Sequence, residues 1–197
     1  MTSTTPFSPP GLNRRLALGG LGMAALSLRG PHVAAQARDL ADHPMAGTWL
    51  TLANPPLPED PQFVATSLFA VDGTVLLNFP SSQVGPQGPF LTASVLGIWE
   101  ADTDRRAHFT AVQLMSAPDG TFLGTITIEG FPEASADGQT FIDDGSHATI
   151  TMRDAAGTIV NQILPNGQPA GRPVTGVRMS VGVPGFLTTP GTATSTS

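Results

Sequence analysis

The pair Asp119-Gly120, set between two apolar runs, constrains the fold of this chain more than any other feature. An Asp-Gly pair in this setting predicts a β-hairpin, because both central residues of a type I′ turn need positive φ. Asp72-Gly73 lies in the same setting. After residue 37, no stretch carries an apolar stripe at the helical period long enough for a helix. We therefore predict an all-β domain with an antiparallel meander.

Eight or nine short strands are expected at regular spacing. They are residues 47–53, 62–71, 74–79, 94–101, 107–117, 121–131, 139–153, 158–164 and 174–181. The stretch 139–153 is interrupted at residues 143–146 by a bulge or a tight turn. Residues 80–89 contain three prolines, and we interpret them as a long loop that is either a lid or a slack connection. Consecutive hairpins favour an up-and-down β-barrel, and a β-sandwich is the alternative.

Strand alternation predicts which side chains face the interior of the barrel. The residues expected inside are Phe122, Gly124, Ile126 and Ile128, then Ala148, Ile150 and Met152, and in the last strand Val177, Met179 and Val181. Both faces of the stretch 107–117 are mixed, so the pattern does not orient that strand.

The first 37 residues have the composition of a secretory signal peptide. They contain three arginines and no acid, an apolar run from Leu16 to Leu28, and the cleavage pattern Ala35-Gln36-Ala37. The run has 13 residues, whereas a membrane-spanning helix needs about 20. Arg14 and Arg15 resemble the twin-arginine export motif, and the general secretory route is the alternative. We predict a signal peptide at 1–37, a barrel domain at 38–181 and a flexible tail at 182–197, in a secreted, periplasmic or cell-envelope protein.

Charge and composition exclude several classes of partner. Three of the nine basic residues lie in the signal, so six arginines stand against 15 acids and the mature chain carries about −9. Such a surface repels nucleic acid and anionic lipid. With no cysteine, the chain has no disulfide, no thiolate nucleophile and no lipid-modified cysteine as a membrane anchor. Neither lysine nor tyrosine is present to supply a Schiff-base amine or a phenolic acid.

Motifs for catalysis and metal binding are absent from the sequence. Nothing matches a phosphate-binding glycine loop, G-x-S-x-G or H-E-x-x-H. Residues 102–113 begin like a calcium loop but have Ala107 and Gln113 where that loop needs glycine and glutamate, so we interpret residues 102–106 as a solvated turn. The histidines of the mature chain show no ligand spacing. We predict neither a metal nor a cofactor.

One polar cluster has two interpretations. His147 follows Asp143 and Asp144, and a carboxylate can orient an imidazole for acid–base chemistry. A hydrated surface turn is the alternative.

Gly47-Thr48-Trp49 on the first strand resembles the Gly-x-Trp signature of lipocalin and calycin barrels. In that family an arginine on the last strand commonly covers the tryptophan, and Arg178 is similar in placement. Alternation, however, puts Arg178 on the face opposite Val177 and Met179, outside the apolar interior. The run from Gly97 to Glu100 also resembles a run in uncharacterised secreted bacterial proteins of lipocalin-like type.

The resemblance implies a monomeric barrel that binds a small apolar or amphipathic molecule in its lumen. The residues expected to line the lumen are Trp49, Trp99, Phe122, Met152 and Met179. We favour a binding protein over an enzyme. The enzyme alternative is a cyclase or isomerase that acts on a hydrophobic substrate without a covalent nucleophile, using an inward polar group from the set Gln113, His108, His147 and Glu100. The third alternative is a non-catalytic interaction module of the cell envelope.

Overall fold

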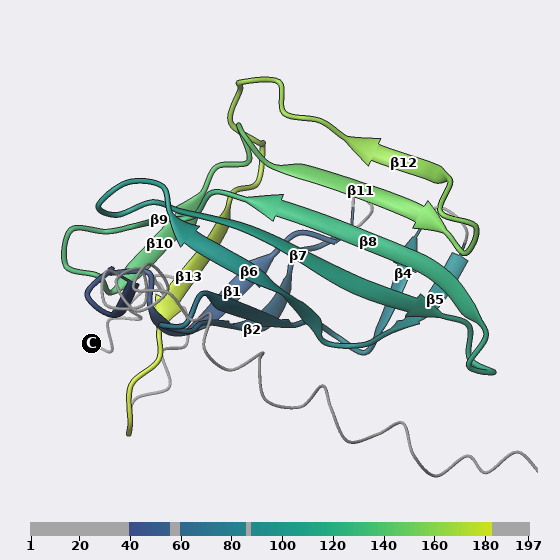
Figure 1. The fold of residues 1–197 in the computed structure, drawn as a ribbon, viewed down its shortest axis with the longest axis horizontal. Helices are drawn as coiled ribbons and strands as arrows, with labels where there is room; N and C mark the ends of the chain where they lie inside the picture. The colour runs from purple at the N-terminus through teal and green to yellow at the C-terminus, as the bar shows by residue number, and fades with distance from the viewer. Residues whose placement is uncertain (1–39, 56–59, 86–87, 183–197) are drawn as a thin grey trace, which may run out of the picture. The chain divides into compact units, whose positions relative to one another are not determined.

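The computed structural model describes residues 40–55, 60–85 and 88–182, and its elements are strands apart from a helical turn at Leu40 and Ala41. The predicted signal peptide and nearly all of the predicted tail lie outside the described residues. Figure 1 labels the strands other than β3. Their bounds are β1 Gly47–Ala53, β2 Phe63–Phe69, β3 Thr74–Asn78, β4 Ser82–Gly85, β5 Gly88–Thr92, β6 Val95–Ala101, β7 Ala107–Ser116, β8 Phe122–Gly130, β9 Glu133–Ala134, β10 Thr140–Asp143, β11 Thr149–Asp154, β12 Ile159–Ile163 and β13 Val174–Arg178.

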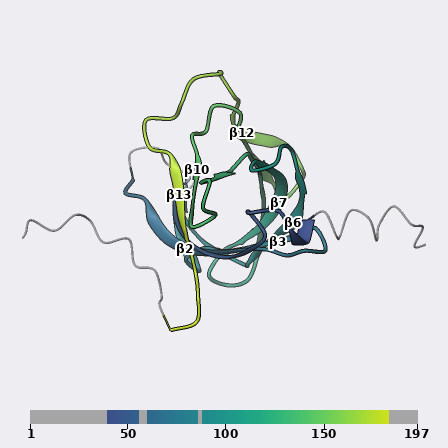
Figure 2. The ribbon, with the colours of Figure 1, turned by 90° about the vertical axis from the view of Figure 1, so that its left-hand side faces the viewer.

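Eleven of the strands form one antiparallel sheet that curls into a half-barrel, seen end-on in Figure 2. The order across the sheet is β12-β11-β8-β7-β6-β3-β2-β1-β13-β10-β9, and the β4–β5 hairpin is attached to the end of β7 through β5. The predicted all-β antiparallel fold is confirmed. A single continuous sheet favours the barrel over the sandwich, because a sandwich needs two stacked sheets.

The edge strand β9 closes one end of this curled sheet. β9 follows β8 beyond Phe131 and Pro132, and Glu133 forms an isolated antiparallel bridge with Arg106, the residue before β7. On its other side β9 pairs with β10, and β10 pairs with β13. At this end the sheet therefore comes back beside the start of β7 through a single bridge, whereas β11 and β12 extend from β8 at the other end.

The hairpin turns lie where the Asp-Gly pairs predict them, but their type differs from the prediction. Gly73 and Gly120 have φ of 87° and 85°, while no described residue other than glycine has positive φ. The Gly73 N–H donates to Ala70 O at 3.0 Å, and the Ala70 N–H donates to Thr74 O at 2.8 Å. This is a type I turn followed by a left-handed glycine, in which only the glycine needs positive φ.

Two predicted connections turn out to be different structures. Residues 80–89 do not form a long loop, because β4 and β5 pair there as a hairpin and β5 joins β7. The break at residues 143–146 is neither a bulge nor a tight hairpin turn. It carries the chain from β10, which pairs with β13, to β11, which pairs with β8.

The side chains predicted to face the barrel interior do so in β11. The prediction is wrong for Phe122 in β8 and for the last strand. Phe122 is 48% exposed, because a register shift between Met115 and Ser116 leaves an extra residue in β8 and interrupts the alternation. Met179 is 37% exposed. In β13 the inward residues are Gly176 and Arg178, because they pair with inward residues of β1. The outward set of the last strand is therefore Val177, Met179 and Val181.

The core fills the closed end of the barrel. The short segment before β1 places Leu40 and Met45 against Trp49 and Trp99, and all four side chains are buried. A second, smaller cluster packs the β4–β5 hairpin onto the opposite end of the sheet through Phe90, Met115, Ile126 and Met152. Phe69, Leu77, Phe109 and Phe141 of the first cluster also line a cavity.

Candidate functional site

The barrel interior contains a cavity of about 140 Å³, which we call the main chamber. Three phenylalanines from different strands form much of its wall: Phe69 of β2, Phe109 of β7 and Phe141 of β10. Ile128, Ile150 and Val174 add aliphatic surface. The hydroxyls of Thr51 and Ser67, which also face the chamber, hydrogen-bond to each other at 2.9 Å. The wall is therefore largely apolar, and two of its polar groups are satisfied within the wall.

Asp143, the last residue of β10, brings a carboxyl group to this chamber. Its side chain is 8% exposed. Oδ2 accepts the Phe131 N–H at 2.8 Å, and Oδ1 accepts the Gly145 N–H at 3.0 Å. Burial raises the pKa of the Asp143 carboxyl above its usual range, although the two backbone N–H donors act in the opposite direction. The carboxyl fastens the bend between β8 and β9 to the 143–146 connection.

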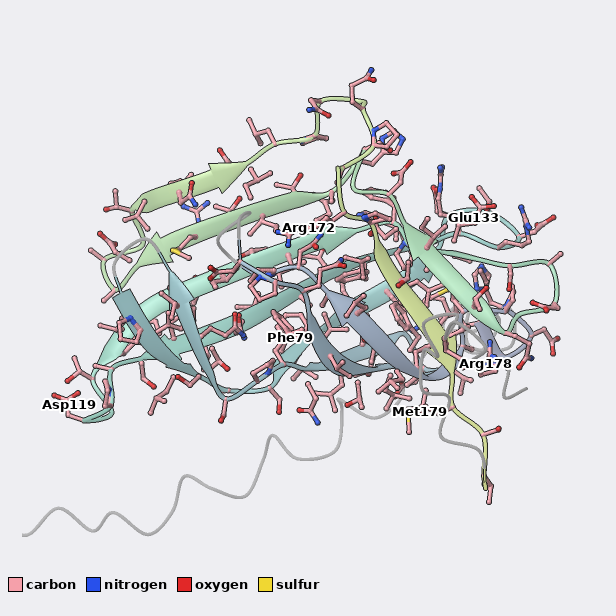
Figure 3. The ribbon with its side chains drawn as sticks, turned by 180° about the vertical axis from the view of Figure 1, so that it is seen from behind. Phe79, Asp119, Glu133, Arg172, Arg178 and Met179 are labelled. Carbon is pink, nitrogen blue, oxygen red and sulfur yellow. The ribbon has the colours of Figure 1, made fainter. Side chains whose placement is uncertain are left out.

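A second cavity of about 30 Å³, which we call the side chamber, adjoins the first. Both chambers share Asn54, Phe79, Ile128 and Ile150 as lining residues. Figure 3 shows Phe79 in the middle of the molecule, between the turn at Asp119 and the end marked by Arg178. Phe79 is therefore placed to separate the two chambers.

Gln113 of β7 lines the side chamber with a side chain that is 1% exposed. Its Nε2 has no hydrogen-bond partner in the part of the chain that the structure describes. Buried amide groups are nearly always paired, so an unpaired one needs an explanation. Of the four polar residues named for the enzyme alternative, only Gln113 reaches the lumen. Glu100 and His147 are exposed, and His108 lies on the outer face.

Both tryptophans are buried, at 0% and 3% exposure, but neither lines the described cavities. The indole N–H of Trp49 donates to Met45 O at 2.9 Å, and that of Trp99 donates to Ala70 O at 2.8 Å. Each ring meets a phenylalanine of the main-chamber wall edge-on, with centroid distances of 5.2 Å from Trp49 to Phe141 and 5.6 Å from Trp99 to Phe69. The tryptophans therefore support the chamber wall from behind.

Of the other residues expected to line the lumen, Met152 lies beside the side chamber, next to Ile126 and Ile150. Phe122 and Met179 are exposed and line none of the described cavities. Strand alternation could have identified Phe69 and Phe141 as inward residues. It could also have identified Asp143, which shares the face of Phe141 two residues away. The sequence could not show whether Gln113 faces inward or outward, because that depends on how β7 pairs with its neighbouring strands.

The predicted acid–base cluster does not assemble in the lumen. Asp144 bonds Ser146, and the exposed His147 contacts Phe131 with ring centroids 5.8 Å apart. On the outer face, His108 bonds Glu129 at 2.8 Å and stacks on Phe131. Asp143 is the one member of the cluster that reaches the main chamber.

Within residues 40–55, 60–85 and 88–182, no group of three histidine or acidic side chains is placed to hold a metal ion. The described residues also contain no helix with the length and apolar character needed to cross a membrane.

Comparison with models of protein families, with curated proteins and with solved structures finds no match for this chain.

Proposed function

We propose that this chain is an exported, lipocalin-like protein that binds a small apolar molecule in its main chamber. The observation that carries the proposal is the cavity of about 140 Å³ inside the barrel, walled by phenylalanine, isoleucine and valine. The interior of a small β-barrel can be filled by side chains or can hold a ligand. An unfilled apolar volume in the interior favours the second outcome.

The volume limits the size of the ligand. An engineered cavity of about 150 Å³ in another protein binds benzene, whereas drug-sized ligands occupy about 300–1,000 Å³. The main chamber therefore suits a single ring or a short branched hydrocarbon and is too small for a fatty acid. The closed end packed around Trp49 adds no volume, because that end is filled by the protein's own core.

The lipocalin-like part of the proposal is supported by Gly47, Trp49 and Arg178. Trp49 pairs with Arg178 across β1 and β13, and the guanidinium lies over the indole ring. Gly47 has φ of 133°, and a Cβ at this position would lie 2.5 Å from the guanidinium of Arg178. A glycine two residues before the tryptophan therefore leaves room for the guanidinium in this position.

The test is a calorimetric titration of the full chain with toluene, carried out on the wild type and on two variants. Ala53 is buried and lines the main chamber, so Ala53→Leu should fill part of it and weaken binding at least about tenfold. Ala155→Leu, the same change at an exposed turn, should bind like the wild type. Absence of toluene binding to the wild type, or equal binding to all three proteins, would contradict the proposal.

One observation supports the isomerase alternative: Asp143 is a carboxyl with a raised pKa beside an apolar chamber. Such a group can act as an acid toward a bound epoxide or polyene. The enzyme alternative predicts faster conversion of a small cyclic epoxide in the presence of the protein, and loss of that acceleration in Asp143→Asn. A ligand recovered unchanged favours binding alone.

The envelope-module alternative is supported by exposed apolar side chains on the outer face of β6 and β7. Leu96 and Val112 pair directly there, with Ile98 and Leu114 beside them. Light scattering measures the association state of the protein. It therefore tests both this alternative and the prediction that the protein is a monomer. Association that disappears in the double variant Leu96→Thr with Ile98→Thr would favour the module.

A further inference from the structure

We propose that Gln113 selects the ligand, by donating a hydrogen bond in the side chamber to an uncharged oxygen acceptor carried by the molecule whose apolar body fills the main chamber. This inference rests on the proposed function and narrows it from apolar molecules in general to small neutral carbonyl compounds.

The side-chain amide of Gln113 has an unpaired hydrogen-bond donor. Gln113 lies on the inward face of β7 between Ala111 and Met115, and its Nε2 is buried without a partner among the described residues. An amide nitrogen donates and does not accept, so the missing partner is an acceptor. An ammonium group, which has no lone pair to offer, would not satisfy it.

Two other amide residues that line the side chamber, Gln83 and Asn54, have hydrogen-bond partners. Gln83 Nε2 donates to Pro80 O at 3.5 Å. Asn54 Nδ2 donates to Arg172 O at 2.9 Å, and Asn54 Oδ1 accepts from Gln62 Nε2 at 2.9 Å. These contacts hold both neighbours in place without using Gln113. Its donor is therefore left facing the side chamber.

Volume determines how much of the ligand this chamber can accept. A space of about 30 Å³ holds roughly one water molecule or one group of similar size, so a carbonyl oxygen fits and a ring does not. The side chamber shares Phe79, Ile128 and Ile150 with the main chamber. A ring in the main chamber with an oxygen directed past Phe79 would occupy both spaces.

Charge excludes an anionic acceptor. No lysine, arginine or histidine lines either chamber in the described part of the chain, whereas the Asp143 carboxyl group reaches the main chamber. A carboxylate ligand would be desolvated there without a cation to pair with it. A ketone or an aldehyde oxygen accepts a hydrogen bond without that cost.

The experiment compares two ligands of the same shape on the full chain, cyclohexanone and methylenecyclohexane, which differ by an oxygen in place of a CH₂ group. Dissociation constants are measured by calorimetry for the wild type, Gln113→Met and Gln83→Met. We expect Gln113→Met to reduce the preference for cyclohexanone by about tenfold, the usual value of one hydrogen bond. The preference should be unchanged in Gln83→Met, which makes the same substitution in the same chamber at a partnered amide.

Three results would overturn the inference, and they separate it from the proposed function. If both ligands bind and Gln113→Met leaves their ratio unchanged, a bound water alone satisfies Gln113 and the proposed function stands. If Gln83→Met changes the ratio as much as Gln113→Met does, Gln113 has no selective role. If neither ligand binds to the wild type, the proposed function fails together with the inference. Gln113→Leu replaces Gln113→Met if the methionine variant does not fold.

Discussion

The guanidinium of Arg178 lies 4.2 Å from the centre of the Trp49 ring and also donates hydrogen bonds to three backbone carbonyls. Its partners are Gly138 O, Ala46 O at 2.8 Å and Pro44 O. One side chain thus joins the last strand, the segment before β1 and the turn before β10. Arg178 covers the tryptophan and closes this end of the barrel.

We predict that Arg178→Met lowers the free energy of unfolding by about 3–5 kcal/mol, because it removes a cation–π contact and leaves partly buried carbonyls unpaired. Urea unfolding measures this loss. Arg153→Met is the matched control. Arg153 bonds a single carbonyl, Gly157 O, in an exposed position, so this change should cost less than about 1 kcal/mol. Similar losses in the two variants would show that Arg178 does not hold the end closed.

Removal of the Gln113 amide should stabilise the ligand-free protein. Methionine has a similar volume and no polar group, so Gln113→Met removes an unpaired donor without leaving a cavity. We expect a gain of about 1 kcal/mol in unfolding free energy. Gln83→Met removes an amide that has a hydrogen-bond partner, so we expect no gain in its unfolding free energy. A clear loss of stability in Gln113→Met would mean that the amide has a partner in solution.

The raised pKa of Asp143 predicts a specific pH dependence of stability. The folded state holds this proton more tightly than the unfolded state, whose pKa lies near 3.8. The stabilising contribution is therefore complete below pH 3.8 and is lost as the pH rises through the raised pKa of the folded protein. The exposed Asp72, Asp119 and Asp137, whose pKa values are lowered by hydrogen bonds, act in the opposite direction.

The difference between wild type and Asp143→Asn isolates this contribution. We expect thermal unfolding to show that the wild type loses stability relative to Asp143→Asn as the pH increases above 3.8. A difference that is constant across this range, or that has the opposite sign, would contradict the burial of the Asp143 carboxyl.

Tryptophan fluorescence should not report on ligand binding. Both indoles lie behind the wall of the main chamber. A phenylalanine ring of that wall lies between each indole and the space where the ligand would bind. We expect the emission maximum of the full chain to stay constant during a toluene titration that gives heat in the calorimeter. A shift of the maximum that follows binding, and that is lost in Trp99→Phe, would place the ligand against Trp99.

Local turn chemistry and strand alternation were enough to predict the fold class from sequence. The two Asp-Gly pairs and the alternation at Gly47–Ala53 lie on strands and turns as expected. Local patterns fail where distant segments decide the structure. The bulge in β8 opposite Met115 and Ser116 turns Phe122 outward, and pairing of β13 with β1 turns Arg178 inward.

The candidate site was harder to predict for the same reason. Phe69, Phe109 and Phe141 come from three strands that meet only when the sheet curls. The cavity is the volume that these side chains fail to fill, and no single strand encodes it. Trp49 and Trp99 have the largest side chains, and we expected them to line the lumen. The size of a side chain, however, does not show whether it packs in the closed end of the barrel or lines a chamber.

The most direct test of the account is the anomalous diffraction of a crystal of this protein soaked in bromobenzene, because bromine locates the bound ring without ambiguity. We expect one bromine peak within the chamber lined by Phe69, Phe109, Phe141 and Ile150, and loss of that peak in Ala53→Leu crystals. A chamber that stays free of bromine in wild-type crystals, or bromine found only on the outer face near Leu96 and Ile98, would contradict the claim that the barrel interior binds small apolar molecules.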